Sequence, residues 1–192
     1  MKQKIILASS SLRRKQILRE AGIGFRAITP RINENASPAL PSRKHVEKLA
    51  AKKALAVAAR VKRGIVIGAD TLLVCRGKKL GKPKTGKQAS AMLRHTSGCK
   101  VDVYTGVAVI DAKTGRKVVD SEKATLTMRR MTDAEIREYV RTGEPIGKAG
   151  AIAIQGIGAK FISRVRGSKS NVMGLPLRTL RRSLKRFGVK MA

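Results

Sequence analysis

A hydroxyl-rich turn followed by two arginines is the first feature of this sequence that could do chemistry. An apolar segment over residues 5–8 runs directly into Ser9 and two more serines, and Arg13 and Arg14 follow at the start of a basic helix. Backbone N–H groups in the first turn of a helix attract anions, and serine hydroxyls and guanidinium groups add further donors. The turn predicts a phosphate site, with a serine cap before a solvated helix as the alternative.

Carboxylates are scarce in this chain, so their positions are informative. There are 12 Asp and Glu residues, and Asp70 follows an apolar strand predicted over residues 64–68. Strand ends of α/β sheets commonly hold ligands, so Asp70 could ligate a metal or act as a general base. Glu34, in the proline-rich loop 30–41, could be the second carboxylate of a Mg²⁺ site. A turn aspartate and a surface glutamate are the alternatives.

Three further polar side chains stand in settings that suit a nucleotide. Lys82 lies in a Gly-Lys-Pro turn, Lys53 lies on a predicted helix, and Gln155 lies among apolar residues and glycines. A side-chain amide both donates and accepts hydrogen bonds, as a base edge does, so Gln155 could read a nucleobase. Two solvated lysines and a glutamine that satisfies a neighbouring loop are the open alternatives.

Alternating strands and helices must position these residues. Strands are predicted over residues 4–8, 25–29, 64–68, 72–75, 103–111, 118–128 and 158–165, and helices over 12–21, 42–61, 85–96, 132–142 and 176–187. This alternation predicts an α/β fold with a mostly parallel sheet covered on both faces. Because the sequence has no repeat, low-complexity tract or long linker, we expect one domain over residues 1–192.

The net charge of +31 is the anomaly of the composition. The chain has 43 Lys and Arg residues, an excess that attracts polyanions and favours salt-dependent association with nucleic acid. The segment 177–187 predicts an amphipathic helix with leucines on one side and cations on the other. We interpret it as a terminal helix packed by its leucines. A nucleic-acid-binding helix is the alternative, although aromatic residues for base stacking make up only 3% of the chain.

Membrane and cysteine signals are weak. No segment is apolar enough to span a membrane, and the N-terminus lacks a cleavable signal pattern, so we expect a cytoplasmic protein. Cys75 and Cys99 lack CxxC spacing, and only two histidines accompany them. Neither a disulfide framework nor a zinc site is indicated.

Several short motifs recur along the chain in a characteristic order. They lie at residues 7–14, 34, 48–54, 68–71, 81–83, 97–98, 103–106, 143–145, 148–150, 154–156 and 170–177. Together they closely resemble the Maf family of nucleoside triphosphate pyrophosphatases over nearly the whole chain. The resemblance implies an elongated mixed sheet flanked by helices, similar to the inosine triphosphate pyrophosphatase folds, and a homodimer.

The resemblance also implies roles for individual residues. Asp70 matches the proposed proton acceptor and Glu34 the metal-associated acid, so both would hold a divalent cation such as Mg²⁺ or Mn²⁺. The positions linked to base choice in the branch that prefers dTTP and UTP are Arg13, Thr71 and Gln155. The positions expected to hold phosphates are Ser9, Arg14, Lys53 and Lys82.

Two classes of function follow from these observations. The first is metal-dependent hydrolysis of dTTP, UTP or related or modified pyrimidine nucleotides to the monophosphate and pyrophosphate. The alternative is a nucleic-acid-binding protein that keeps the fold and uses its basic surface. Carboxylates repel a phosphate backbone unless a metal intervenes, so the presence of Glu34 and Asp70 among cations favours the enzyme.

Overall fold

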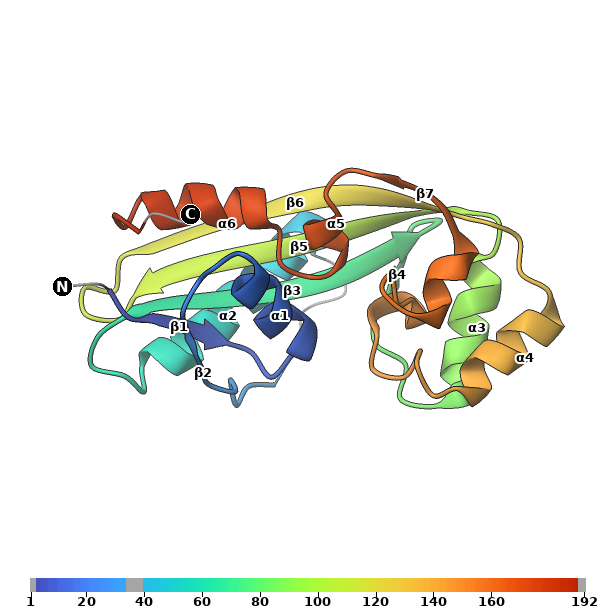
Figure 1. Cartoon of the computed structure of the whole chain (residues 1–192), viewed down its shortest axis with the longest axis horizontal. Helices are drawn as coiled ribbons and strands as arrows, with labels where there is room; N and C mark the ends of the chain where they lie inside the picture. The colour runs from blue at the N-terminus through green and yellow to red at the C-terminus, as the bar shows by residue number, and fades with distance from the viewer. Residues whose placement is uncertain (1–2, 34–39, 190–192) are drawn as a thin grey trace. The chain divides into compact units, whose positions relative to one another are not determined.

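Figure 1 shows the computed structural model of the chain, which describes residues 3–33 and 40–189. Glu34 lies outside these residues. The chain divides into two compact units: unit 1 comprises Met1–Asp70, Thr105–Glu122 and Met173–Ala192, and unit 2 comprises Thr71–Tyr104 and Lys123–Val172. The unit boundaries fall inside three long strands, each of which contributes residues to both units. The expectation of one domain over residues 1–192 stays a prediction.

The elements are those of a mixed α/β protein. The strands are β1 (Ile5–Ala8), β2 (Arg26–Ala27), β3 (Ile65–Cys75), β4 (Lys78–Leu80), β5 (Lys100–Asp111), β6 (Lys117–Met128) and β7 (Ile162–Arg166). The α-helices are α1 (Leu12–Glu20), α2 (Ser42–Ala58), α3 (Gly86–Thr96), α4 (Asp133–Arg141), α5 (Lys169–Val172) and α6 (Leu177–Lys185), and the 3-10 helices are η1 (Ala149–Ala151) and η2 (Ile157–Phe161).

The strand order is β2-β1-β3-β5-β6-β7, with β4 paired to β3 (Figure 1). Strand β1 runs parallel to β2 and β3, whereas β3 with β4 and β6 with β7 are antiparallel. The expectation of a mostly parallel sheet is therefore wrong, and the mixed sheet implied by the resemblance is confirmed. The two strands predicted over 64–68 and 72–75 are one strand, β3, because the polar residues between them stay in the extended backbone.

The sheet of unit 1 is covered on both faces, as the sequence predicted. On one face, Leu7 and Ile67 pack with α1 and with α6 through Leu180. On the other face, Ile6 and Val66 pack with α2. Consecutive residues of β1 and β3 thus enter opposite cores, which explains why these strands read as continuous apolar runs.

The C-terminal helix α6 packs through its leucines, as the sequence predicted. Leu180 and Leu184 are buried in the core with α1 and the sheet. Arg178 and Lys185 are exposed, and Arg182 forms an ion pair with Asp120. The leucines therefore account for the position of the helix, and its cations lie at the surface.

Helix α2 approaches the sheet very closely because glycine stands at two facing positions. A Cβ placed on Gly68 of β3 would overlap the carbonyl oxygen of Ala50 and lie 2.8 Å from the backbone nitrogen of Ala54. At Gly106 of β5, a Cβ would lie 2.8 Å from the backbone nitrogen of Glu47. Any side chain at these positions would push the helix away from the strands.

Substituting Gly68 by alanine is expected to lower the free energy of unfolding by about 1–3 kcal/mol, because the added methyl group meets rigid helix backbone. Urea denaturation measures the change. Gly24→Ala is the matched control, since a Cβ at Gly24 meets no atom within 4 Å. Equal stability of the two variants would show that α2 can shift without cost and that close packing at Gly68 is unimportant.

In unit 2, one face of the sheet packs against α3 and α4. Val101, Val103, Leu126 and Met128 alternate along β5 and β6 and contribute to a core that also contains Tyr139 of α4. The residues between them, including Lys100 and Asp102 or Thr125 and Thr127, are exposed or half-buried. Such alternation is typical of a sheet with one face open to water, so the expected cover on both faces is not found in this part of the sheet.

Cys75 and Cys99 are buried free thiols in the core of unit 2. Burial, together with the neighbouring Cys99 thiol, raises the pKa of Cys75 above its usual value. Within the described residues, no helix has the length and apolar composition needed to cross a bilayer.

Candidate active site

The serine turn after β1 is organised by its own hydroxyl groups. Ser9 is buried, and its Oγ accepts a hydrogen bond from the backbone N–H of Ser11 at 3.1 Å. Ser11 caps α1, because its Oγ accepts from the backbone N–H of Arg14 at 3.5 Å. The first turn of α1 holds no acidic residue, so nothing in that turn offsets the partial positive charge of the helix N-terminus. The turn has the electrostatic character that an anion site needs.

Two arginines in the first turn of α1 add permanent positive charge beside the serines. Arg13 and Arg14 are both half-buried. The Nε of Arg14 donates to the carbonyl oxygen of Gly174 at 2.7 Å, which ties α1 to the segment that precedes α6. Arg14 therefore positions the chain around the turn as well as contributing charge to it.

A buried ion pair joins α2 to β3. The Nζ of Lys53 lies 2.7 Å from the Oδ1 of Asp70, and the two side chains are only 4% and 8% exposed. The close packing of α2 on Gly68 brings Lys53, on the same helix, beside Asp70, two residues further along β3. Because removing a charge from water costs several kcal/mol, such groups are buried in pairs. The pair holds a carboxylate in a defined position inside unit 1.

The register of the parallel strands brings the serine turn and the ion pair to the same edge of unit 1. Ala8 of β1 lies opposite Gly68 of β3. Ser9 follows Ala8 directly, and Asp70 lies two residues after Gly68. Both residues therefore come after the last pair that β1 forms with β3. They lie at the carboxyl end of β1, where α/β sheets bind ligands.

Three predicted residues belong to unit 2. Thr71 directly follows Asp70 on β3 and is half-buried. Lys82 lies after β4, and Gln155 lies in the turn before η2. The last two residues are exposed, so a ligand in solution can reach them.

Glu144 organises the turn that carries Gln155, a role that the sequence did not predict. Its Oε1 accepts from the N–H of Ile157 at 3.0 Å, and its Oε2 accepts from the N–H of Gly158 at 2.9 Å. Burial raises the pKa of Glu144, but hydrogen bonds led by that from Gly158 outweigh it and hold the pKa below its ordinary value. The signals available in the sequence were the scarcity of acidic residues, of which Glu144 is one, and the glycines at 156 and 158.

The described residues fit a cation that is shared with a substrate. Among residues 3–33 and 40–189, no group of three or more His, Cys, Asp or Glu side chains could hold a metal ion. Asp70 offers one buried carboxylate at the strand edge, beside the anion-attracting turn. Mg²⁺ commonly binds one or two carboxylates together with water and substrate phosphates. This donor set suits such a cation and does not suit a tightly held structural metal.

Comparison with known proteins agrees with this chemistry. Residues 4–187 match the family model described as Maf-like protein. The dTTP/UTP pyrophosphatase of Pelotomaculum thermopropionicum is 46% identical over 186 residues, which is 97% of each chain. The dTTP/UTP pyrophosphatase of Moorella thermoacetica is 45% identical over 97% of this chain and 96% of its own. That of Methanosarcina barkeri is 39% identical over 98% and 96%, respectively.

The fold is similar to a solved structure of low sequence identity. The Staphylococcus aureus Ham1 protein aligns with a TM-score of 0.53 over 96% of this chain and 97% of its own, at 15% identity. That likeness concerns the fold alone, and it confirms the predicted α/β class with a mixed sheet flanked by helices. Since the family model and relatives above 30% identity both span almost the entire sequence, this chain belongs to the Maf-like protein family.

Proposed function

We propose that this protein hydrolyses nucleoside triphosphates, with dTTP and UTP as the preferred class, to the monophosphate and pyrophosphate. The observation that carries the proposal is the buried Lys53–Asp70 pair beside the serine turn at one strand edge. A carboxylate at the same strand edge as groups that attract phosphate supports general-base hydrolysis of an anhydride. The dTTP/UTP pyrophosphatases among the relatives support this choice of substrate.

In the proposed reaction, a water oxygen bonds to the α-phosphorus and the bond to the bridging oxygen of the β-phosphate breaks. Asp70 accepts the proton of the water, and Lys53 holds the Asp70 carboxylate in place. The groups that bind phosphate oxygens are Ser9, Arg14, Lys53 and Lys82. Asp70 and Glu34 would hold a divalent cation, Mg²⁺ or Mn²⁺, which supplies Lewis-acid polarisation of the phosphate when bound.

The test is the identity of the product and its dependence on metal. Purified protein with Mg²⁺ or Mn²⁺ is expected to release pyrophosphate and the monophosphate from dTTP or UTP. Anion-exchange chromatography distinguishes these products from orthophosphate and the diphosphate. Orthophosphate as the first product, or equal rates after chelation of all divalent metal, would contradict the proposal.

Replacing Gln155 by alanine is expected to weaken the preference for pyrimidine over purine triphosphates. We propose that Gln155, with Thr71 and Arg13, reads the base, and an unpaired base edge costs about 1–3 kcal/mol, or roughly 5- to 150-fold in selectivity. The measurement is the ratio of kcat/KM for UTP and ATP. Gln16→Ala is the control, since Gln16 is exposed and contacts Glu20 on the same helix. An unchanged ratio in Gln155→Ala would place base reading elsewhere.

We also propose that the protein associates with nucleic acid, because its 43 Lys and Arg residues far outnumber its 12 Asp and Glu residues and attract the phosphate backbone. This association accompanies the hydrolase activity and does not replace it. The homodimer implied by the resemblance and the cytoplasmic location stay predictions. Light scattering of the purified protein measures the first.

A further inference from the structure

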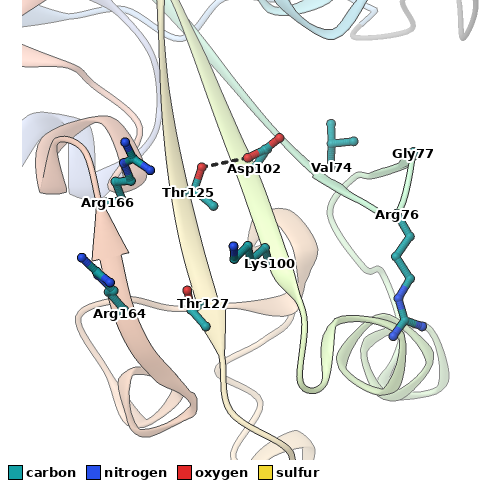
Figure 2. A pocket seen from close by; sticks show the side chains of 9 residues that line it. All are labelled: Val74, Arg76, Gly77, Lys100, Asp102, Thr125, Thr127, Arg164 and Arg166. Carbon is teal, nitrogen blue, oxygen red and sulfur yellow. Dashed lines mark hydrogen bonds between the residues drawn. The ribbon is translucent and has the colours of Figure 1, made fainter.

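Unit 2 carries a basic groove on the face of its sheet that points away from α3 and α4. The groove has a volume of about 410 Å³. Its walls come from β3, β5, β6 and β7, as Figure 2 shows. The lining residues are Val74, Arg76, Gly77, Lys100, Asp102, Thr125, Thr127, Arg164 and Arg166. None of them belongs to the proposed active site.

The alternation of the strands explains why polar residues collect in this groove. Val101 and Val103 of β5 face the core with α3 and α4, so Lys100 and Asp102 face the opposite side. In the same way, Leu126 of β6 is in the core while Thr125 and Thr127 line the groove. The groove is therefore fixed by the packing of the core behind it.

Strand β7 adds two arginines in register with the threonines. Arg166 pairs across the strands with Thr125, and Arg164 pairs with Thr127. In Figure 2, Arg164, Lys100 and Arg76 form a row that crosses the sheet from β7 to the turn after β3. That row crosses three strand spacings, roughly 14 Å.

The groove has a strong excess of positive charge. Its single carboxylate, Asp102, is engaged by the Nζ of Lys123 at 2.8 Å and by the hydroxyl of Thr125 at 2.8 Å. The hydrogen bond to Asp102 raises the pKa of Lys123 above its ordinary value. In the part of the chain that the structure describes, no carboxylate forms an ion pair with the cations of the groove, which are Arg76, Lys100, Arg164 and Arg166.

The arrangement suits an extended phosphate polymer better than one small anion. All four cations are exposed, so they can each neutralise a phosphate without enclosing it. A nucleic-acid strand carries one phosphate about every 3.4 Å along the helix axis, so a row of roughly 14 Å meets several of them. The Nζ of Lys123 lies over the ring of Tyr104, 5.6 Å from the ring centroid. The lining of the groove holds no aromatic side chain on which a base could stack.

We propose that this groove binds the phosphodiester backbone of nucleic acid without sequence preference. The guanidinium and ammonium groups pair with phosphate oxygens, and the hydroxyl of Thr127 adds a hydrogen-bond donor. The proposal rests on the association with nucleic acid proposed above and assigns that association to one surface. It requires neither the serine turn nor the Lys53–Asp70 pair.

Two charge-matched variants test the assignment. The groove variant is Lys100→Gln/Arg164→Gln/Arg166→Gln, and the control variant is Arg178→Gln/Lys185→Gln/Arg186→Gln on and just after α6. Each removes one lysine and two arginines, all exposed, so both change the net charge equally. The probe is a fluorescein-labelled single-stranded DNA of mixed sequence, with binding measured by anisotropy from 50 to 300 mM KCl.

The groove variant is expected to bind at least about tenfold more weakly than the wild type at 100 mM KCl. The slope of log Kd against log salt concentration should fall by about two, because three contacts each contribute about 0.7. The control variant should stay within about threefold of the wild type. Hydrolysis of dTTP should be unchanged in both variants, which also shows that they are folded.

The possible results distinguish three hypotheses: binding of DNA in the groove, association with nucleic acid in general, and hydrolysis of dTTP. If DNA binding weakened equally in both variants, the binding would depend on the total charge of the protein, and the assignment to the groove would be wrong. A wild-type protein that does not bind DNA would overturn the association and the groove together. Displacement of the DNA by an equimolar amount of dTTP would show that DNA and dTTP share one site, and it would also overturn the proposal. Absence of dTTP hydrolysis by the wild-type protein would contradict only the proposed enzymatic function.

Discussion

Replacing Asp70 by asparagine is expected to lower the turnover of dTTP and UTP by roughly two or more orders of magnitude. Asparagine keeps the shape of the side chain, but its amide cannot take the proton of the attacking water. The amide oxygen can still accept a hydrogen bond from Lys53, although the buried ammonium loses its counter-charge. Initial rates of pyrophosphate release at saturating substrate and metal measure the effect.

The control for this variant is Asp133→Asn. Asp133 is exposed and forms a surface ion pair with Arg94, so its loss should change turnover less than about twofold. Thermal unfolding of Asp70→Asn distinguishes lost chemistry from lost structure. A folded Asp70→Asn protein with near-normal turnover would show that Asp70 does not act as the base.

Replacing Lys53 by methionine is expected to lower the free energy of unfolding by about 3–5 kcal/mol. Methionine fills similar space, but it leaves the carboxylate of Asp70 buried without its cation. The neighbouring Lys52→Met is the matched control, because Lys52 lies on the same helix and its Nζ contacts the carbonyl oxygen of Asn33 at an exposed site. That exposed change should cost no more than about 0.5 kcal/mol. Urea denaturation at pH 7 measures both.

A double variant separates the stability of the pair from its proposed role in hydrolysis. Lys53→Met/Asp70→Leu removes both charges, so it should recover most of the stability that Lys53→Met loses. It should not recover hydrolysis of dTTP, since the carboxylate is gone. If Lys53→Met were as stable as Lys52→Met, the 2.7 Å contact would contribute little to the fold.

The sequence predicted most helices well because their start signals are local. Thr85 and Thr132 cap α3 and α4 through their hydroxyls, as the composition at those positions suggests. Strands were harder to delimit. The polar residues Asp70 and Thr71 suggested a break, but β3 continues through them to Cys75 because its extent depends on pairing with other strands.

For the candidate site, residue type and position in the sequence were enough to identify Ser9, Lys53 and Asp70 as chemically suitable side chains. That Lys53 and Asp70 form one buried pair follows from the packing of α2 onto the backbone of Gly68, a contact between segments distant in the sequence. The link from Glu144 to the Gln155 turn also crosses 13 residues or more and leaves no periodic trace in the sequence.

The distribution of charge divides in the same way. The net charge of +31, and with it an attraction to polyanions, follows from the composition alone. The sequence could not locate the basic groove, because Arg76, Lys100 and Arg164 come from strands far apart in the chain. Local periodicity determines which side of a strand a residue faces, whereas strand order and register decide which residues become neighbours.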